Sequence, residues 1–362
     1  MSSNLQALSD AGVSIWLDDL SRDRLQSGSL AELIATSNVV GVTTNPSIFA
    51  AAIKGSQLYK ADILALKSQG ESTVSIVTTL TTSDVKAACE LFLGVFESTN
   101  HVDGRVSIEV EPSLAHASEA TVLQGKALWD LVDRPNLLVK VPATLQGLPA
   151  IRELTAAGIS INVTLIFSVQ RYEKVMDSYL AGLEDRVAAG LPIDQIHSVA
   201  SFFVSRIDTE IDKRLDASYV HSPLRGKSAI ANAVLAYEAY LLMISSPRWH
   251  ELVKHGANQQ RPLWASTGVK DKTYESTRYV IDLVAAHCVN TMPEATLNET
   301  REHGTVLGDT ITPAIPEAHL HFIALREAGI DFEDVVAFLE RDGVKKFADA
   351  WQELLDNVSA VS

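Results

Sequence analysis

Short apolar runs alternate along the chain with longer stretches in which apolar residues recur at helical spacing, as at Val169, Tyr172 and Val175. The runs are typical of strands buried on both faces, and the stretches between most of them are typical of amphipathic helices. Alternation of this kind favours a closed (β/α)8 TIM barrel, with an open doubly wound sheet as the alternative. No Gly-rich dinucleotide fingerprint or P-loop follows a predicted strand, which weakens the alternative. The predicted strands are residues 14–18, 39–44, 106–111, 137–141, 160–167, 198–204, 263–267 and 288–292.

Two regions interrupt the alternation of strands and helices. Residues 68–104 carry a helical pattern, and the Ser- and Thr-rich stretch 78–84 within them resembles a helix N-cap region. Residues 209–260 are typical of a long helical insertion with a break at 222–223, and the chain after Pro316 is expected to be helical and to pack on the barrel. We expect a single barrel domain over 1–362, with helical insertions near 68–104 and 209–260 and C-terminal helices over 317–357.

Composition and charge exclude some classes of function. Of 362 residues, 46% are hydrophobic and 21% are charged, which is ordinary for a globular protein. No stretch approaches the roughly 20 apolar residues that span a bilayer, and the first residues lack the features of a secretory signal, so no membrane partner is expected. The net charge of −15 argues against a nucleic-acid partner. The sparse cysteines, Cys89 and Cys288, are typical of a cytoplasmic protein.

One lysine lies inside an apolar strand. Lys140 stands in residues 136–144, a run bounded by Pro135 and containing Pro142. Lysine is almost never fully buried without a partner. A desolvated amine loses its proton more readily and then attacks carbonyl groups, which is the first step of Schiff-base catalysis. The alternative is a lysine at the strand end that extends its ammonium group into water.

Polar residues of several predicted strands can be assigned to one face, because side chains alternate along a strand. These faces are expected to converge inside the barrel, near the carboxyl ends of the strands, where barrel active sites lie. An amine, two carboxylates and a hydroxyl are the groups that imine catalysis requires. The alternative is a hydrogen-bonded network with a structural role. The residues concerned are Asp18, Glu109, Lys140, Asn162 and Thr164.

Two cations follow the predicted sixth and seventh strands. Arg206 and Lys270, together with Ser266, would lie at the same end of the barrel and could hold a phosphate group, or else form surface ion pairs. No group of His, Cys and carboxylate residues has the spacing of a metal site, and His250 and His255 lack matching ligands. A metal is therefore not expected.

Six motifs, in order along residues 15–292, resemble those of the transaldolase family. The chain is longer than the related fructose-6-phosphate aldolases, and its helical additions indicate the longer bacterial-type subfamily. The motifs are VTTNPS at 42–47, VSIEV at 106–110, VKVPAT at 139–144, INVTLIFS at 161–168, SFFVSR at 201–206 and WAS at 264–266.

The resemblance implies a role for each matching residue. Lys140 matches the Schiff-base lysine, and Asp18 resembles the acid/base that acts on the C4 hydroxyl of the donor. Asp19 is adjacent, but its neighbours and the strand face favour Asp18. Glu109 and Thr164 resemble the pair that moves protons through a bound water. The residues that resemble substrate or phosphate contacts are Asn45, Asn162, Ser201, Phe203, Arg206 and Ser266.

The chain departs from the family pattern at one position. Familiar transaldolases carry Arg two residues after the serine that matches Ser266, where this chain has Gly268. Lys270 would replace the missing charge in the substrate site.

The resemblance predicts a cytoplasmic transferase of the non-oxidative pentose phosphate pathway, working as a monomer or homodimer. It would transfer a dihydroxyacetone unit from sedoheptulose 7-phosphate to glyceraldehyde 3-phosphate, giving erythrose 4-phosphate and fructose 6-phosphate, through a Schiff base on Lys140. The resemblance implies that this reaction needs no metal or organic cofactor. Three alternatives remain: a class I aldolase that releases dihydroxyacetone, a non-catalytic barrel that binds sugar phosphates, and one part of a bifunctional enzyme.

Overall fold

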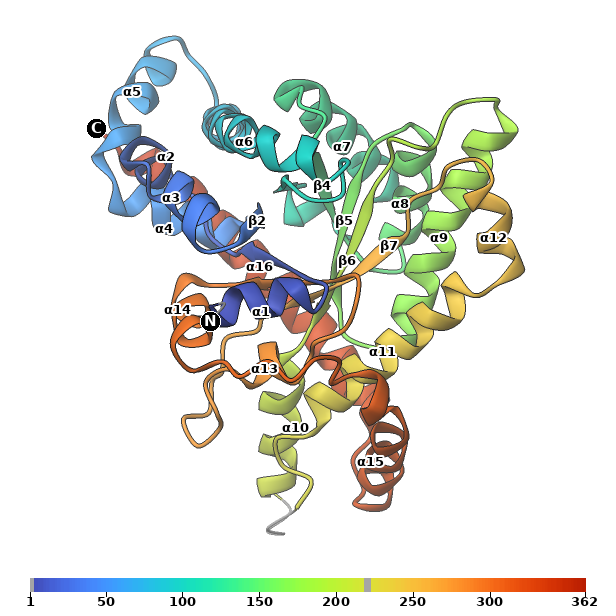
Figure 1. Cartoon of the computed structure of the whole chain (residues 1–362). Coiled ribbons are helices and arrows are strands. Elements are labelled where there is room, and N and C mark those ends of the chain that lie inside the picture. The colour runs from blue at the N-terminus through green and yellow to red at the C-terminus, as the bar shows by residue number, and fades with distance from the viewer. Residues whose placement is uncertain (1–2, 218–222) are drawn as a thin grey trace.

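The computed structural model describes residues 3–217 and 223–362, and it places eight parallel strands in a closed barrel surrounded by helices (Figure 1). Each strand pairs with its neighbour in sequence, and β8 closes the ring by pairing with β1, where Ile15 lies opposite Asn290. The (β/α)8 barrel is therefore confirmed, and the open doubly wound sheet is excluded. The strands are β1 (Val13–Leu17), β2 (Val39–Val42), β3 (Arg105–Glu109), β4 (Leu137–Pro142), β5 (Ile161–Ile166), β6 (Ser198–Phe203), β7 (Gln260–Ala265) and β8 (Cys288–Met292).

The seventh strand begins and ends earlier than the sequence predicts. Gln260 and Arg261 are polar and do not read as part of a buried strand, yet both are buried in β7. The Gln260 side-chain amide donates to Ser198 Oγ at 2.8 Å, and Arg261 donates to the Asp103 carboxylate at 2.8 Å. Hydrogen bonds to other buried polar side chains thus allow polar residues where apolar ones are expected.

Amphipathic helices cover the outside of the barrel. In α9 (Val169–Ala188), Tyr172, Val175 and Leu183 are buried, as their helical spacing predicts. Ser168 caps the start of this helix, because its hydroxyl accepts a hydrogen bond from the Arg171 amide. Other helices between β3 and β8 or directly after β8 include η2 (Pro112–Leu114), α7 (Ser118–Val132), α8 (Gly147–Ala156), α13 (Arg278–Ile281) and α14 (Glu294–His303).

The region between β2 and β3 is helical, but the N-cap predicted over 78–84 is wrong. Helix α6 begins after Ser72, whose hydroxyl accepts from the Ser75 amide. Thr81 and Thr82 lie inside α6, and their hydroxyls donate to backbone carbonyls one turn earlier. Such local bonds satisfy threonine hydroxyls within a helix, so a cap-like composition does not mark a helix start here. The segments before β3 are α1 (Asn4–Asp10), α2 (Arg22–Ser27), α3 (Ser29–Thr36), α4 (Pro46–Gly55), η1 (Gln57–Tyr59), α5 (Lys60–Ser68) and α6 (Thr73–Ser98).

The predicted helical insertion over 209–260 forms α10 (Ser205–Ala217), α11 (Ser228–Ile244) and α12 (Pro247–Val253), so helix begins directly after β6. The predicted break at 222–223 lies partly outside the described residues, which omit Ser222. Within the described ranges, no single helix is long and apolar enough to cross a membrane, although α11 and α12, bent by 64° at their junction, meet the length and composition criteria as a pair.

The C-terminal region is helical, as predicted, and consists of η3 (Thr312–Ala314), α15 (Ile315–Glu327) and α16 (Phe332–Ala360). Helix α16 packs against α4, α6, α10 and β5. Its red ribbon passes behind the blue N-terminal helices in Figure 1, and its residue Phe347 lines the cavity at one end of the barrel. Leu339, Phe347 and Leu354 of this helix are buried.

Candidate active site

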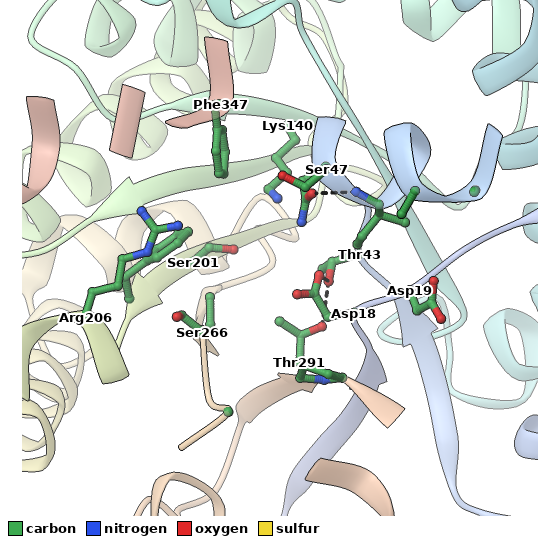
Figure 2. Close-up of a pocket in the computed structure, with 18 of the residues that line it drawn as sticks. Asp18, Asp19, Thr43, Ser47, Lys140, Ser201, Arg206, Ser266, Thr291 and Phe347 are labelled. Atoms are coloured by element: carbon green, nitrogen blue, oxygen red, sulfur yellow. Dashed lines mark hydrogen bonds between the residues drawn. The ribbon is translucent and has the colours of Figure 1, made fainter. Parts of the chain in front are cut away.

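A cavity of about 490 Å³ opens at the carboxyl ends of the strands, beside α16 (Figure 2). Glu109, Asn162 and Thr164 lie deeper, in the barrel interior, where the Asn162 and Thr164 side chains are fully buried. The structure thus divides the predicted site between a cavity wall and a polar interior beneath it. The predicted residues that line the cavity are Asp18, Asn45, Lys140, Ser201, Phe203, Arg206, Ser266 and Lys270.

Lys140 lies on β4 and is only 5% exposed. The register of β3 and β4 places it opposite Glu109, and its Nζ is 3.7 Å from Glu109 Oε2. Nζ also donates a hydrogen bond to the Thr44 carbonyl at 3.0 Å and lies 5.8 Å from the centre of the Phe347 ring. The alternative of a lysine that extends into water is therefore wrong, and the amine lies at the cavity floor with a carboxylate as its partner.

Glu109 lies deeper than Asp18, the other carboxylate of the predicted site. Burial raises its pKa to about 7, although the nearby Lys140 ammonium opposes the rise and Asp18 adds to it. Glu109 Oε2 and Thr164 Oγ1 are both buried and form no hydrogen bond within the described part of the chain. A carboxyl group with a pKa near neutrality can both donate and accept a proton at physiological pH. Glu109 and Thr164 therefore provide groups suited to proton transfer beside the Lys140 amine.

Asp18 follows β1 directly and accepts a hydrogen bond from the Thr43 hydroxyl at 2.6 Å. Burial raises the pKa of its carboxyl, while Lys140 and the Thr43 bond oppose that rise and Asp19 adds to it. Figure 2 shows Asp18 near the middle of the cavity and Asp19 at its edge. The Asp19 carboxylate forms an ion pair with Arg24 at 2.7 Å. The structure therefore gives the two adjacent carboxylates different partners, as the assignment to opposite strand faces predicts.

The polar residues of β5 and β6 form a hydrogen-bonded chain. Ser201 donates to Asn162 Oδ1 at 2.7 Å, and the Asn162 amide donates to Ser107 Oγ at 3.0 Å. Of these three, only Ser201 lines the cavity. Asn162 therefore fixes the position of Ser201 from below. On the other side, Asn45 is the N-cap of α4 and accepts from the Ile48 amide at 3.1 Å.

Arg206 lies in the first turn of α10, with its guanidinium carbon 5.2 Å from the centre of the Phe203 ring. Its Nη1 is buried and has no hydrogen-bond partner among residues 3–217 and 223–362. Burial lowers the pKa of the guanidinium, and the charge of Asp342 opposes this. Ser266 also lines the cavity, with its Oγ 3.0 Å from the Oγ of Ser205, which precedes Arg206. A guanidinium with a buried nitrogen that is unpaired among the described residues, at a cavity that hydroxyl groups also line, is suited to bind an anionic substrate group.

Comparison with known proteins identifies the family. The family model for transaldolase/fructose-6-phosphate aldolase matches residues 15–358. The chain belongs to this family. A protein named transaldolase from Thermobifida fusca is 54% identical over 99% of this chain and 98% of its own length. Proteins with the same name from Saccharopolyspora erythraea and Mycobacterium tuberculosis are each 55% identical, over 98% and 99% of this chain and 97% and 96% of their own lengths.

The transaldolase resemblance inferred from six motifs is thus confirmed, and it extends through the C-terminal helices. Full-length similarity to transaldolases makes the chain a transferase enzyme. At the position where familiar transaldolases carry Arg, Gly268 lies beside Lys270: a Cβ built on Gly268 would be 3.8 Å from Lys270 Nζ. The lysine ammonium therefore lies next to the space that a longer side chain at 268 would enter.

Other residues also line the cavity that the sequence did not assign to the site, among them Thr43, Thr291 and Phe347. Thr291 is on the same face of β8 as Val289 and lies at the carboxyl end, so strand alternation could have found it. Thr43 stands within the 42–47 motif. No local sequence pattern marks Phe347 as a site residue, because a buried aromatic residue on an amphipathic helix is typical of the hydrophobic core.

Proposed function

We propose that the chain transfers a dihydroxyacetone unit from sedoheptulose 7-phosphate to glyceraldehyde 3-phosphate, producing erythrose 4-phosphate and fructose 6-phosphate in the non-oxidative pentose phosphate pathway. The observation that carries this proposal is the buried pair of Lys140 and Glu109 at the floor of a cavity whose outer wall holds Arg206 and Lys270. An amine for the ketone and cations for the phosphate match the two ends of such a substrate.

Imine formation is assigned to Lys140, Glu109 and Thr164. Lys140 gives its ammonium proton to Glu109, and the resulting neutral amine attacks the C2 ketone of the donor and forms a carbinolamine. Glu109 then donates a proton to the departing hydroxyl group, which leaves as water, and Thr164 supports this transfer. The protonated imine withdraws electrons from the neighbouring C3–C4 bond, which makes that bond cleavable. Hydrolysis of the imine runs through the same groups in reverse.

Carbon–carbon cleavage is assigned to Asp18. Its carboxylate takes the proton of the donor's C4 hydroxyl, C4 becomes an aldehyde, and the electron pair of the C3–C4 bond moves into the imine to form an enamine. The acceptor aldehyde then binds, the enamine carbon attacks it, and Asp18 returns the proton to the new hydroxyl group. Asp18 therefore acts as the base in cleavage and as the acid in addition to the acceptor, so that no net proton is gained or lost.

Contacts with the substrate are assigned to both walls of the cavity. Asn45 and Ser201 bind hydroxyl groups of the three-carbon fragment, and Asn162 holds Ser201 in place. Phosphate binding is assigned to Arg206, Ser266 and Lys270, with Phe203 supporting the guanidinium. The same proposal includes activity without a metal or organic cofactor, location in the cytoplasm and a monomeric or homodimeric state.

The test is acceptor dependence. With fructose 6-phosphate as donor, glyceraldehyde 3-phosphate should be released continuously only when erythrose 4-phosphate is present, and be limited to one equivalent per site without it. Continuous release without acceptor would instead identify an aldolase that liberates dihydroxyacetone. No release in either case would favour a non-catalytic barrel, although Lys140, Glu109 and Asp18 together argue against it.

A further inference from the structure

Two threonines meet Asp18 at the junction of three adjacent strands. Thr43 follows β2, Thr291 lies in β8, and Asp18 follows β1 between them. The backbone ties these positions together, because the Asp18 amide donates to the Met292 carbonyl and the Thr43 amide donates to the Leu17 carbonyl, both at 2.9 Å. Thr43 is 2% exposed and Thr291 is 3% exposed. The two hydroxyls are therefore fixed beside the carboxylate by the barrel itself.

The hydroxyl groups form a chain with a defined direction. Thr43 Oγ1 is 2.6 Å from both Asp18 Oδ1 and Thr291 Oγ1 (Figure 2). An ionised carboxylate only accepts hydrogen bonds, so Thr43 gives its single proton to Asp18. Thr291 must then donate to Thr43. Each bond in such a chain polarises the next one.

We propose that Thr43 and Thr291 are positioning residues for Asp18, holding one carboxylate oxygen so that the other meets the donor's C4 hydroxyl. This inference rests on the proposed function, in which Asp18 is the acid/base of carbon–carbon cleavage. Two bonds of 2.6 Å in series fix the side-chain rotamer and favour the ionised form, which is the form that accepts a proton. Neither threonine would contact the reacting atoms.

Other charged groups around Asp18 also influence whether its carboxyl group is ionised. Lys140 on β4 favours the ionised carboxylate, whereas Asp19 in the same loop disfavours it, and Glu109 on β3 also faces it. The Thr43 hydroxyl bond opposes the rise in pKa that burial causes. Loss of the hydroxyl should therefore raise the pKa of Asp18 further.

The test is Thr43→Val, which removes the hydroxyl and keeps the shape of the side chain. We expect kcat to fall by ~10- to 100-fold, as for loss of a hydrogen bond to a charged group, with little change in KM. The acidic limb of the pH profile of kcat/KM should move to higher pH. Thr43→Ser should restore most of the activity, and Thr291→Val should move the limb in the same direction by less. Thr300→Val removes a buried hydroxyl that bonds only to backbone and is the matched control.

A trapping measurement separates this inference from the proposed function. Borohydride trapping with fructose 6-phosphate should show that Thr43→Val accumulates the intact six-carbon adduct on Lys140, because the cleavage step is slowed after imine formation. An unchanged pH profile and an unchanged ratio of six-carbon to three-carbon adduct, in Thr43→Val or Thr291→Val, would overturn the inference. Absence of any adduct in the unsubstituted enzyme would instead overturn the proposed function.

Discussion

Lys140 and Glu109 depend on each other for their place inside the barrel. Each is a charged group that would be unfavourable to bury alone, and each has the other as its partner at 3.7 Å. Burial raises the pKa of Glu109 to about 7 even beside the ammonium. Burial of Glu109 costs folding free energy, and it also produces a carboxyl group that can exchange protons at neutral pH.

Glu109→Gln should reduce kcat by at least ~100-fold, because it removes the proton donor for imine formation and hydrolysis. The limb of the kcat pH profile near pH 7 should disappear with it. The matched control is Glu111→Gln, two residues farther along the chain, where the carboxylate bonds to Ser113 near the surface. Retention of full activity in Glu109→Gln would contradict the assigned role.

The raised pKa of Glu109 also predicts how stability depends on pH. Folding favours the protonated form, so the stabilisation from this group is complete below its ordinary pKa of 4.5 and is lost as pH rises through about 7. The melting temperature of Glu109→Gln, relative to the unsubstituted protein, should therefore increase between pH 5 and pH 8. Thermal unfolding at several pH values measures this, and a flat or falling difference would contradict the burial argument.

Lys270→Ala should raise KM for phosphorylated substrates by ~10-fold with little change in kcat, because it removes one charge from the proposed phosphate site. Unphosphorylated fructose should be unaffected as donor. Lys270→Arg should keep the low KM, and Lys272→Ala, an exposed neighbour, is the control. Equal losses for phosphorylated and unphosphorylated donors would show that Lys270 does not bind phosphate.

At the scale of elements, α16 completes the site from outside the strand–helix repeat. Phe347 of α16 lines the cavity near the Lys140 amine. Gly343, one turn earlier, lets the helix approach the barrel: a Cβ there would be 3.0 Å from Leu165 Cδ2 and 3.5 Å from Arg206 Nη1. The helix therefore lies over the Lys140 amine and against the Arg206 side chain.

Phe347→Ala should increase acceptor-independent release of dihydroxyacetone several-fold, because the ring shields the enamine on Lys140 from water. The substitution should also lower stability by about 3 kcal/mol, as for other large-to-small changes in a core. Released dihydroxyacetone is measured without acceptor, after folding is checked by circular dichroism. Phe338→Ala, partly buried on the same helix, is the control, and an equal release from both variants would contradict the shielding role.

The sequence was most informative where a repeating pattern applies. Strand alternation placed Asp18, Glu109 and Lys140 on inward faces, and the structure puts all three at or beneath one cavity. It could not place Phe347, because an amphipathic pattern tells which face of a helix is buried and not what covers it. The early start of β7 was also hidden, since the partners of Gln260 come from another strand.

For the whole molecule, we propose that residues 1–362 form one domain. The buried apolar side chains of the barrel and of the C-terminal helices belong to one continuous core. Far-UV circular dichroism and tryptophan fluorescence should therefore report a single coincident unfolding transition in urea. Two separated transitions would indicate that the C-terminal helices or an insertion fold independently.

The most direct test of the central claim is borohydride trapping with fructose 6-phosphate, followed by peptide mass mapping. The account predicts a reduced three-carbon adduct on the peptide that carries Lys140, and its loss in Lys140→Arg. An adduct on another lysine, or no adduct with active substrate, would contradict the Schiff-base mechanism on which every other assignment in the site depends.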